Sequence, residues 1–206
     1  MGLARLWLAL AGAVFPAVLF AAAPADPDVR HDSTYLTGQL LIASEAMRDP
    51  RFQNTVLVMV RHNAYGAMAL IINRPLREQP LAKIFKAIGV ESENASGIVP
   101  IYEGGPVERE RAFILHSGDY RRDGTIVITA DAALTATAEA FRDLVGANRP
   151  EKFLIAFGYA GWAPGQLENE MAHNAWHSAP FDSKLVFEAD RQKLWERAIQ
   201  RRTRDL

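Results

Sequence analysis

The segment GYAGWAPGQLENEMAHNAW, from Gly158 to Trp176, gathers the residue types in this chain that are most able to do chemistry. Three glycines and two tryptophans stand there beside two glutamates and a histidine. Glycine N–H groups can cradle a phosphate, carboxylate and imidazole groups can ligate a metal, and aromatic rings can line a ligand pocket. The alternative is that the segment only packs its own backbone.

Several kinds of catalytic or binding loop are excluded by the residues themselves. A phosphate loop needs glycines followed by lysine and then serine or threonine, whereas Gln166 and Leu167 follow Gly165. The G-x-S-x-G turn of serine hydrolases does not occur in the chain. The chain has no cysteine, which excludes cysteine nucleophiles, disulfides and thiolate metal sites. We therefore expect no catalytic residues of these classes and no cofactor.

A metal site is one alternative that the segment leaves open. Glu170, His173 and His177 are spaced i, i+3, i+7, so they would project from one face of a helix, and histidines four apart can ligate zinc. The zinc-protease pattern, however, has glutamate directly after its first histidine, where this chain has Asn174. We expect no bound metal and keep these three residues as the alternative.

Packing is the favoured interpretation of the segment. The preceding strand is expected to end at Gly158, Gly161 to let the chain turn, and a helix to run over residues 166–176. Trp162 and Trp176 would each bury on the order of 200 Å² at this corner. Three further side chains at helical spacing would face the core: Leu167, Met171 and Ala175.

A ligand cleft is the second interpretation, because polar side chains recur at strand ends and turns, where binding residues concentrate. The candidate cleft consists of His62, Asn73, Arg74, Gly104, Gly105, His116, Tyr159, Gly161, Trp162 and Gln166. His116 could equally be a hydrogen-bonded core histidine, and Arg74 a structural partner of Glu103.

The elements that must position these residues alternate between strands and helices. Strands are expected at 40–47, on both sides of His62–Gly66, before the Gly104-Gly105 turn, and over the sequences RAFILHS, GTIVITA, KFLIAFG and KLVFEA. Helices are expected over 80–89, after a cap at Asp131, and at the C-terminus. The helix after Asp131 would bury Leu134, Ala138, Phe141 and Val145, and the C-terminal helix Leu194, Trp195, Ala198 and Ile199. This order predicts a mixed sheet with helices packed against it.

The first 25 residues are expected to be a secretory signal rather than part of the fold. Arg5 precedes an uncharged apolar run over 6–20, and Ala23-Pro24-Ala25 has the pattern of a cleavage site. A membrane anchor is the alternative. The expected organisation is a signal at 1–25, a flexible lead-in at 26–35 and one domain at 36–206.

Composition and net charge limit the classes of partner that we expect the chain to bind. Hydrophobic residues make up 49% of the chain and charged residues 23%, as in an ordinary globular protein. The formal net charge is −1, without the basic excess typical of proteins held on nucleic-acid phosphates. We expect an unknown protein or small ligand as the partner, no nucleic acid, and membrane contact only through the N-terminal segment.

Four motifs, in this order and at these intervals, resemble the AlgH/YqgE family of bacterial proteins: GQLLIA with DPRF, HNAYGAMALIINRPL, EGGPV with FILH, and GYAGWAPGQLENE. The resemblance covers about residues 38–195. It implies a single α+β domain whose bent, mostly antiparallel mixed sheet forms a pseudo-barrel with flanking helices. It also implies no established enzymatic activity, although some members carry a label as regulators of exopolysaccharide genes.

This sequence departs from the family pattern at three places. Arg61 stands where an acidic residue often precedes the histidine, Ala69 stands where glycine is common, and a signal-like extension precedes the first strand. The extension argues against a DNA-binding role. With the resemblance and the lack of a complete catalytic constellation, it leads us to expect a non-catalytic ligand- or protein-binding domain, periplasmic or secreted. The alternatives are an unrecognised hydrolase or metal-dependent enzyme, and a cytoplasmic regulator as in typical members.

We predict that the native protein begins near Asp26, because the charged start, apolar run and small-residue site occur in the order that signal peptidase requires. N-terminal sequencing of protein from its own cells checks this. A sequence beginning at Met1 or Gly2 would contradict it.

Overall fold

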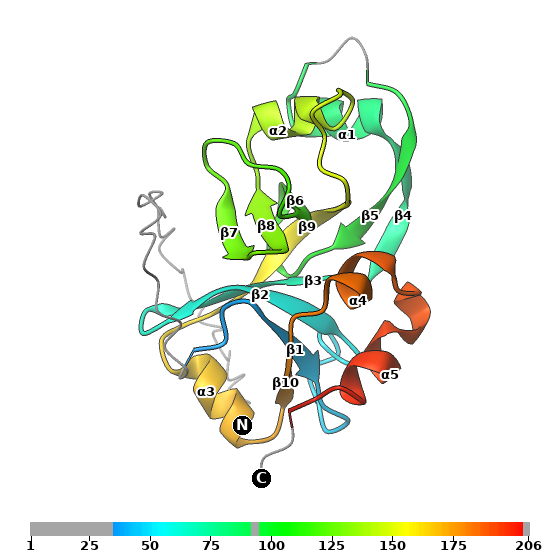
Figure 1. The fold of residues 1–206 in the computed structure, drawn as a ribbon. Helices are drawn as coiled ribbons and strands as arrows, with labels where there is room; N and C mark the ends of the chain where they lie inside the picture. The colour runs from blue at the N-terminus through cyan, green and yellow to red at the C-terminus, as the bar shows by residue number, and fades with distance from the viewer. Residues whose placement is uncertain (1–34, 92–94, 204–206) are drawn as a thin grey trace, which may run out of the picture.

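The computed structural model describes residues 35–91 and 95–203 and forms one α+β domain. Ten strands make one sheet, in which β10-β1-β2-β3-β9-β6-β8-β7 follow one another, and the antiparallel pair β4 and β5 joins at β9 (Figure 1). Among the pairings of the described strands, only β5 with β9 is parallel. The α+β class is therefore confirmed, while the sheet is bent and does not close into a barrel.

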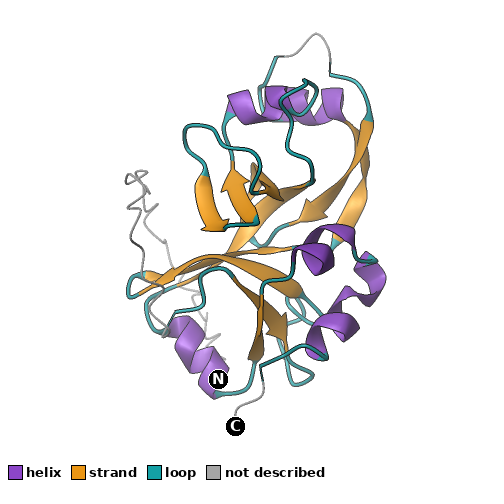
Figure 2. Cartoon of the chain, in the orientation of Figure 1, coloured by secondary structure: helices purple, strands orange, loops and turns teal. Residues whose placement is uncertain are grey.

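Figure 2 separates the strands from the short helices that flank them. The strands are β1 (Gln39–Ala43), β2 (Val56–Asn63), β3 (Gly66–Ile71), β4 (Pro75–Pro80), β5 (Ile98–Glu103), β6 (Val107–Ser117), β7 (Ile126–Thr129), β8 (Ala132–Thr135), β9 (Phe153–Trp162) and β10 (Trp176–Pro180). The helices are α1 (Leu81–Ala87), α2 (Ala138–Asp143), α3 (Gln166–Ala172), α4 (Ser183–Glu188), the 3₁₀ turn η1 (Arg191–Lys193) and α5 (Leu194–Ile199).

Strand β9 belongs to both halves of the sheet. Its first half, up to Phe157, pairs with β5 on one edge and β6 on the other, whereas Ala160–Trp162 pairs with β3. Gly158 lies between the two halves with φ +74° and provides the bend. The expectation that this strand ends at Gly158 was therefore wrong, because the strand bends there and continues to Trp162.

The β5–β6 turn crosses this bend at backbone contact distance. A Cβ added to Gly158 would lie 2.4 Å from the Gly105 carbonyl oxygen, and one added to Gly105 would lie 2.1 Å from the Tyr159 carbonyl carbon. A Cβ at Gly104 would lie 2.3 Å from the Gly158 carbonyl oxygen. Gly161 has no such constraint, since its φ is not in the left-handed region and its nearest neighbour is the Tyr159 ring at 3.3 Å. The turning role expected of Gly161 thus falls to Gly158.

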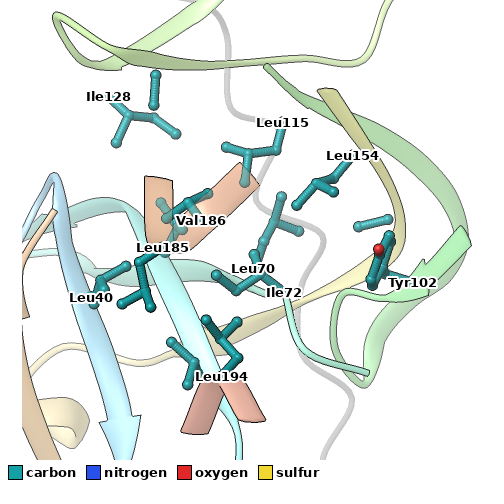
Figure 3. Packing of buried hydrophobic residues seen from close by; sticks show 14 of the residues in the cluster. Leu40, Leu70, Ile72, Tyr102, Leu115, Ile128, Leu154, Leu185, Val186 and Leu194 are labelled. Atoms are coloured by element: carbon teal, nitrogen blue, oxygen red, sulfur yellow. The ribbon is translucent and has the colours of Figure 1, made fainter. Parts of the chain in front are cut away.

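Three apolar clusters fill the domain. The largest packs Leu185, Val186 and Leu194 of the C-terminal helices against Leu40 and Leu70 of the sheet (Figure 3). The second lies under α1 and α2 and includes Phe85 and Phe141, and the third lies under α3. The predicted stripe of the C-terminal helix is confirmed: Leu194 and Ala198 are fully buried, while Trp195 and Ile199 pack at its margin.

Two expected elements have the opposite secondary structure. Ala132–Thr135 forms strand β8 instead of the start of a helix, because all four residues are buried and pair with β6 and β7. The helix begins at Ala138, where Thr137 accepts a hydrogen bond from the Ala140 N–H. Residues 184–189, expected as a strand, lie mostly in helix α4, which Asp182 caps and which buries Leu185 and Val186. Short apolar runs do not by themselves distinguish strand from helix.

The helix of the glycine–tryptophan segment is also shorter than expected. It ends at Ala172, and Asn174 adopts a φ of +57°. Trp176 then begins β10, which pairs with β1. Within the described part of the chain, none of the helices has the length and apolar character needed to span a bilayer. The expected signal segment at 1–25 lies outside the described residues.

We predict that Gly158→Ala lowers the free energy of unfolding by at least about 1–3 kcal/mol, because the new side chain meets both an unfavourable φ and the Gly105 backbone. Gly165→Ala is the matched control: Gly165 also has φ +74° but has no atom within 4 Å of the added Cβ. Urea unfolding of both variants measures the difference. Equal losses would show that the crossing leaves room for a methyl group.

Candidate functional site

The two tryptophans of the segment share one acceptor. Oε2 of Glu170 accepts hydrogen bonds from the indole nitrogens of Trp162, at 2.9 Å, and Trp176, at 2.7 Å. The rings meet edge to face with centroids 5.8 Å apart, and both side chains are buried. Buried indole N–H groups need such a partner. Glu170 therefore fixes where the end of β9 meets the start of β10, as the packing interpretation requires of this corner.

Helix α3 brings Glu170 to this position. Gln166 starts the helix and accepts a hydrogen bond from the Ala163 N–H at 3.1 Å, while its amide donates to Glu170 Oε1 at 2.9 Å. Leu167 is buried beneath the helix and Met171 packs beside it, as their spacing predicted, whereas Ala175 packs there from beyond the end of the helix. We refer to α3 with Trp162, Trp176 and Glu170 as the α3 corner.

Sequence reasoning missed Phe52 and the role of Glu170 at this corner. Phe52 lies against both tryptophans, with centroids 6.4 Å from Trp162 and 5.4 Å from Trp176. The sequence offers Glu170 only as an alternative metal ligand. A buried indole N–H needs an acceptor, which could have pointed to a nearby glutamate. The sequence does not show, however, that the two tryptophans lie side by side and share one.

His62 joins the residues just before β1 to helix α3. Its Nδ1 accepts a hydrogen bond from the Leu36 N–H at 3.1 Å, so Nε2 carries the proton and donates to Glu168 Oε1 at 3.1 Å. The ring is buried and meets Tyr35 edge to face at 5.1 Å. Both ring nitrogens are engaged, so His62 has no nitrogen left to accept a proton from a substrate.

His116 is a core histidine, the alternative that the sequence left open. Its side chain is fully buried, Nδ1 donates to the Ser117 carbonyl at 2.9 Å, and Nε2 accepts from the Thr135 hydroxyl at 2.9 Å. The Thr125 hydroxyl continues this chain to Thr135 at 2.7 Å. Burial lowers the pKa of His116, which favours the neutral ring that this pattern requires.

Asn73 and Arg74 hold a loop. Asn73 Oδ1 accepts from the Val56 N–H and its amide donates to the Asn54 carbonyl, both at 2.8 Å. Arg74 donates to the Pro50 and Gln53 carbonyls, and its guanidinium lies 3.8 Å from Glu103. The structural partnership with Glu103, foreseen as an alternative for Arg74, is present.

Tyr159 lies beside the glycine crossing. Its hydroxyl donates to Glu108 Oε1 at 3.3 Å, and its ring meets Phe113 edge to face. Burial, followed by the charge of Glu108, raises the pKa of the Tyr159 phenol. The ten cleft candidates thus fall into four places: the α3 corner with His62, Gly161, Trp162 and Gln166; the crossing with Gly104, Gly105 and Tyr159; the loop tie of Asn73 and Arg74; and the separate network of His116.

The three residues of the alternative metal site, Glu170, His173 and His177, do not lie on one face of a helix. Because α3 ends at Ala172, His177 lies in β10, 3.8 Å from Glu45, and not on a face shared with Glu170. His173 Nδ1 is 2.8 Å from the Asn169 carbonyl. The described residues hold no group of three histidine, aspartate or glutamate side chains arranged for a metal ion.

Tyr65 is the most exposed of the large apolar side chains described, at 86%. It stands on the turn between β2 and β3, where its backbone N–H donates to Asn63 Oδ1 at 2.9 Å. The next residue, Gly66, sits so close to the α3 corner that an added Cβ would lie 2.3 Å from the Trp162 carbonyl oxygen. An aromatic side chain is thereby held in solvent on a fixed turn.

Comparison with known proteins identifies relatives across nearly the whole described domain. A family model described as AlgH-like matches residues 40–206. A UPF0301 protein of Caulobacter vibrioides is 41% identical over 170 residues, covering 82% of this chain and 87% of the relative. A UPF0301 protein of Rhodospirillum rubrum is 42% identical over 154 residues, covering 75% and 80%.

Two solved structures share the fold. The solution structure of the AlgH protein from Pseudomonas aeruginosa superposes with a TM-score of 0.71 at 33% identity, covering 87% of this chain and 92% of that one. The crystal structure of protein DIP2367 from Corynebacterium diphtheriae gives a TM-score of 0.65 at 17% identity, covering 82% and 87%. The second likeness concerns the fold alone.

We predict that Glu170→Ala destabilises the domain by about 1–3 kcal/mol for each indole N–H left without a partner. Urea unfolding followed by tryptophan fluorescence measures this, with the exposed α5 residue Glu196→Ala as the matched control. If Glu170→Ala unfolds at the same urea concentration as Glu196→Ala, the shared acceptor does not stabilise the corner.

We predict that His116 makes stability fall as the pH drops. Its folded pKa lies below the ordinary value of 6.5, so the unfolded chain binds the proton more readily. The stabilisation of the folded state by the neutral His116 ring is complete above pH 6.5. It is lost as the pH falls from 6.5 toward the pKa of His116 in the folded state. Urea unfolding between pH 7.5 and 5 should show this loss.

The His116→Gln variant should show a smaller loss over the same range. An unchanged pH dependence in His116→Gln would contradict the assignment to this histidine.

Proposed function

The chain belongs to the AlgH-like family, and we propose that it is a non-catalytic domain, exported to the cell envelope, that binds a protein partner through the surface around Tyr65. The observation that carries the proposal is the exposed tyrosine on a fixed turn beside the α3 corner. The surface includes Tyr65, the neighbouring Asn63, and the exposed residues Gly161 and Gln166.

The non-catalytic part rests on how the reactive side chains are used. Both ring nitrogens of His62 and of His116 already have hydrogen-bond partners, and the Glu170 carboxylate holds two indoles and an amide. A general base must reach the proton that it removes, and these groups are occupied within the fold. Throughout the described chain, no buried side-chain nitrogen or oxygen lacks a partner. This pattern favours a binding surface over a reaction centre.

The partner-binding part rests on Tyr65. Tyrosine is enriched among the residues that dominate protein interfaces, because it buries a large area at a small cost in side-chain entropy. A residue whose backbone is already held in a hydrogen-bonded turn loses less freedom on binding than one on a mobile loop. Gly66 and Trp162 tie this turn to the core through their close backbone contact. The surface is therefore suited to recognition by a preformed anchor.

The export part rests on the sequence of residues 1–25, in which a charged start precedes an apolar run and a small-residue site. The near-neutral net charge of −1 favours a protein partner over nucleic acid. An envelope protein would meet its partner outside the cytoplasm, which separates this proposal from a role as a regulator of genes.

We predict that a photo-reactive phenylalanine at position 65 cross-links a discrete protein in the native cells, and that the adduct is recovered from the envelope fraction. The matched control carries the same group at Val127, an exposed residue of β7. Mass spectrometry identifies the adduct, and Tyr65→Ser in an affinity pull-down should lower the yield of that same protein at least tenfold.

Two outcomes count against the proposal in different ways. Equal adducts at positions 65 and 127, or an unchanged yield with Tyr65→Ser, would remove Tyr65 from the binding surface. Recovery of the chain with intact N-terminus from the cytosol would remove the export.

A further inference from the structure

A cationic hollow lies between the β6–β7 loop and the α2–β9 loop, in the opposite half of the sheet from the β2–β3 turn that carries Tyr65. It has a volume of about 420 Å³ and is lined by Asp119, Tyr120, Arg121, Arg122, Asn148 and Arg149. Three guanidinium groups and one carboxylate therefore face the same space.

The carboxylates of Asp119 and Asp143 in this region already have hydrogen-bond partners. Asp119 accepts a hydrogen bond from the Glu151 N–H at 2.9 Å, and a hydrogen bond from Ser117 holds the pKa of its carboxyl below the usual value. Asp143 receives the Arg122 Nε–H and the Tyr120 hydroxyl, both at 2.7 Å. Burial, with the hydrogen bond to Asp143, raises the pKa of Tyr120 to about 12, so its hydroxyl stays a donor.

Arg121 and Arg149 have no carboxylate within ion-pair distance among residues 35–91 and 95–203. Arg122 uses its Nε–H for Asp143, and a guanidinium has further donors beyond that one. The hollow therefore has an excess of positive charge and of N–H donors. Guanidinium forks match carboxylate and phosphate oxygens better than any other side chain.

A second hollow adjoins the first, because Arg149 lines both. It has a volume of about 360 Å³, and most of its side chains are apolar: Leu81, Ile98, Val99, Leu144, Val145 and Phe153. Ile98 is 67% exposed, one of the most exposed apolar side chains described. Apolar side chains, the exposed Ile98 among them, thus adjoin the cationic hollow.

We propose that these two hollows form one binding site for a free, single-chain amphipathic anion, with its carboxylate or phosphate against Arg149 and Arg121 and its apolar part against Ile98 and Phe153. The charge of the first hollow selects the head group, and the side chains of the second select the chain. Each volume lies within the roughly 300–1,000 Å³ of small-ligand sites.

The proposal is tested by calorimetric titration of the protein purified from its own cells, with each ligand below the concentration at which it forms micelles. Octyl phosphate carries both chemical features, inorganic phosphate only the charge, and octyl glucoside only the chain. We expect octyl phosphate to bind at least tenfold more tightly than either of the others. Octanoate distinguishes a carboxylate from a phosphate head group, and the tighter of the two assigns it.

Variants distinguish binding in the two hollows from nonspecific adsorption of the ligand to the protein. Arg149→Met should weaken octyl phosphate at least tenfold, while Arg197→Met, an exposed arginine of α5, should leave it unchanged. Ile98→Asp should weaken octyl phosphate but not inorganic phosphate. Tyr65→Ser should leave all of these affinities unchanged, so this site and the protein-binding surface fail or succeed separately.

Three results would overturn the proposal. They are equal affinity for octyl phosphate and octyl glucoside, unchanged affinity in Arg149→Met, and binding only to micelles or to anionic lipid vesicles. The last result would assign the arginines to a membrane surface instead.

Discussion

The contact on which the rest of the structure depends is the crossing of two backbones at Gly105 and Gly158. Strand β9 serves both halves of the sheet, and it can change halves only by bending where the β5–β6 turn passes over it. A side chain at either position would overlap backbone atoms of the other segment. The fold therefore places glycine where the halves meet, because only glycine lacks the atom that would overlap and adopts the positive φ at little cost.

The bend also sets what lies at each end of β9. Phe153 begins the strand and lines the second hollow, which Arg149 also lines, whereas Trp162 ends it and is held by Glu170 at the α3 corner. The proposed ligand site and the proposed protein-binding surface are thus built on the two ends of one strand. Nothing in the contacts requires that the two be occupied together.

Because the polar groups of the interior already have hydrogen-bond partners, the proposed binding sites lie on the surface and not in the core. The groups that look reactive in the sequence satisfy one another or the backbone: His62 with Glu168 and Leu36, His116 with Thr135, and Glu170 with two tryptophans. Buried polar groups that are fully paired stabilise one arrangement of the core. The two proposed sites accordingly use surface groups of the described chain: an exposed aromatic side chain on one half and a cationic hollow on the other.

The sequence by itself determined the local features. Apolar spacing placed Leu194 and Ala198 on the buried face of the last helix and Leu167 beneath α3, and proline and glycine bounded the helix over 81–87. The motifs also indicated the family and its α+β class. Only the tertiary structure decided that Ala132–Thr135 is a strand, that residues 183–188 are a helix, that Gly158 rather than Gly161 makes the bend, and that Glu170 joins two indoles. The reason is physical: each of these outcomes depends on a pairing partner or a backbone crossing from a distant part of the chain, and a single segment read alone does not contain its partner.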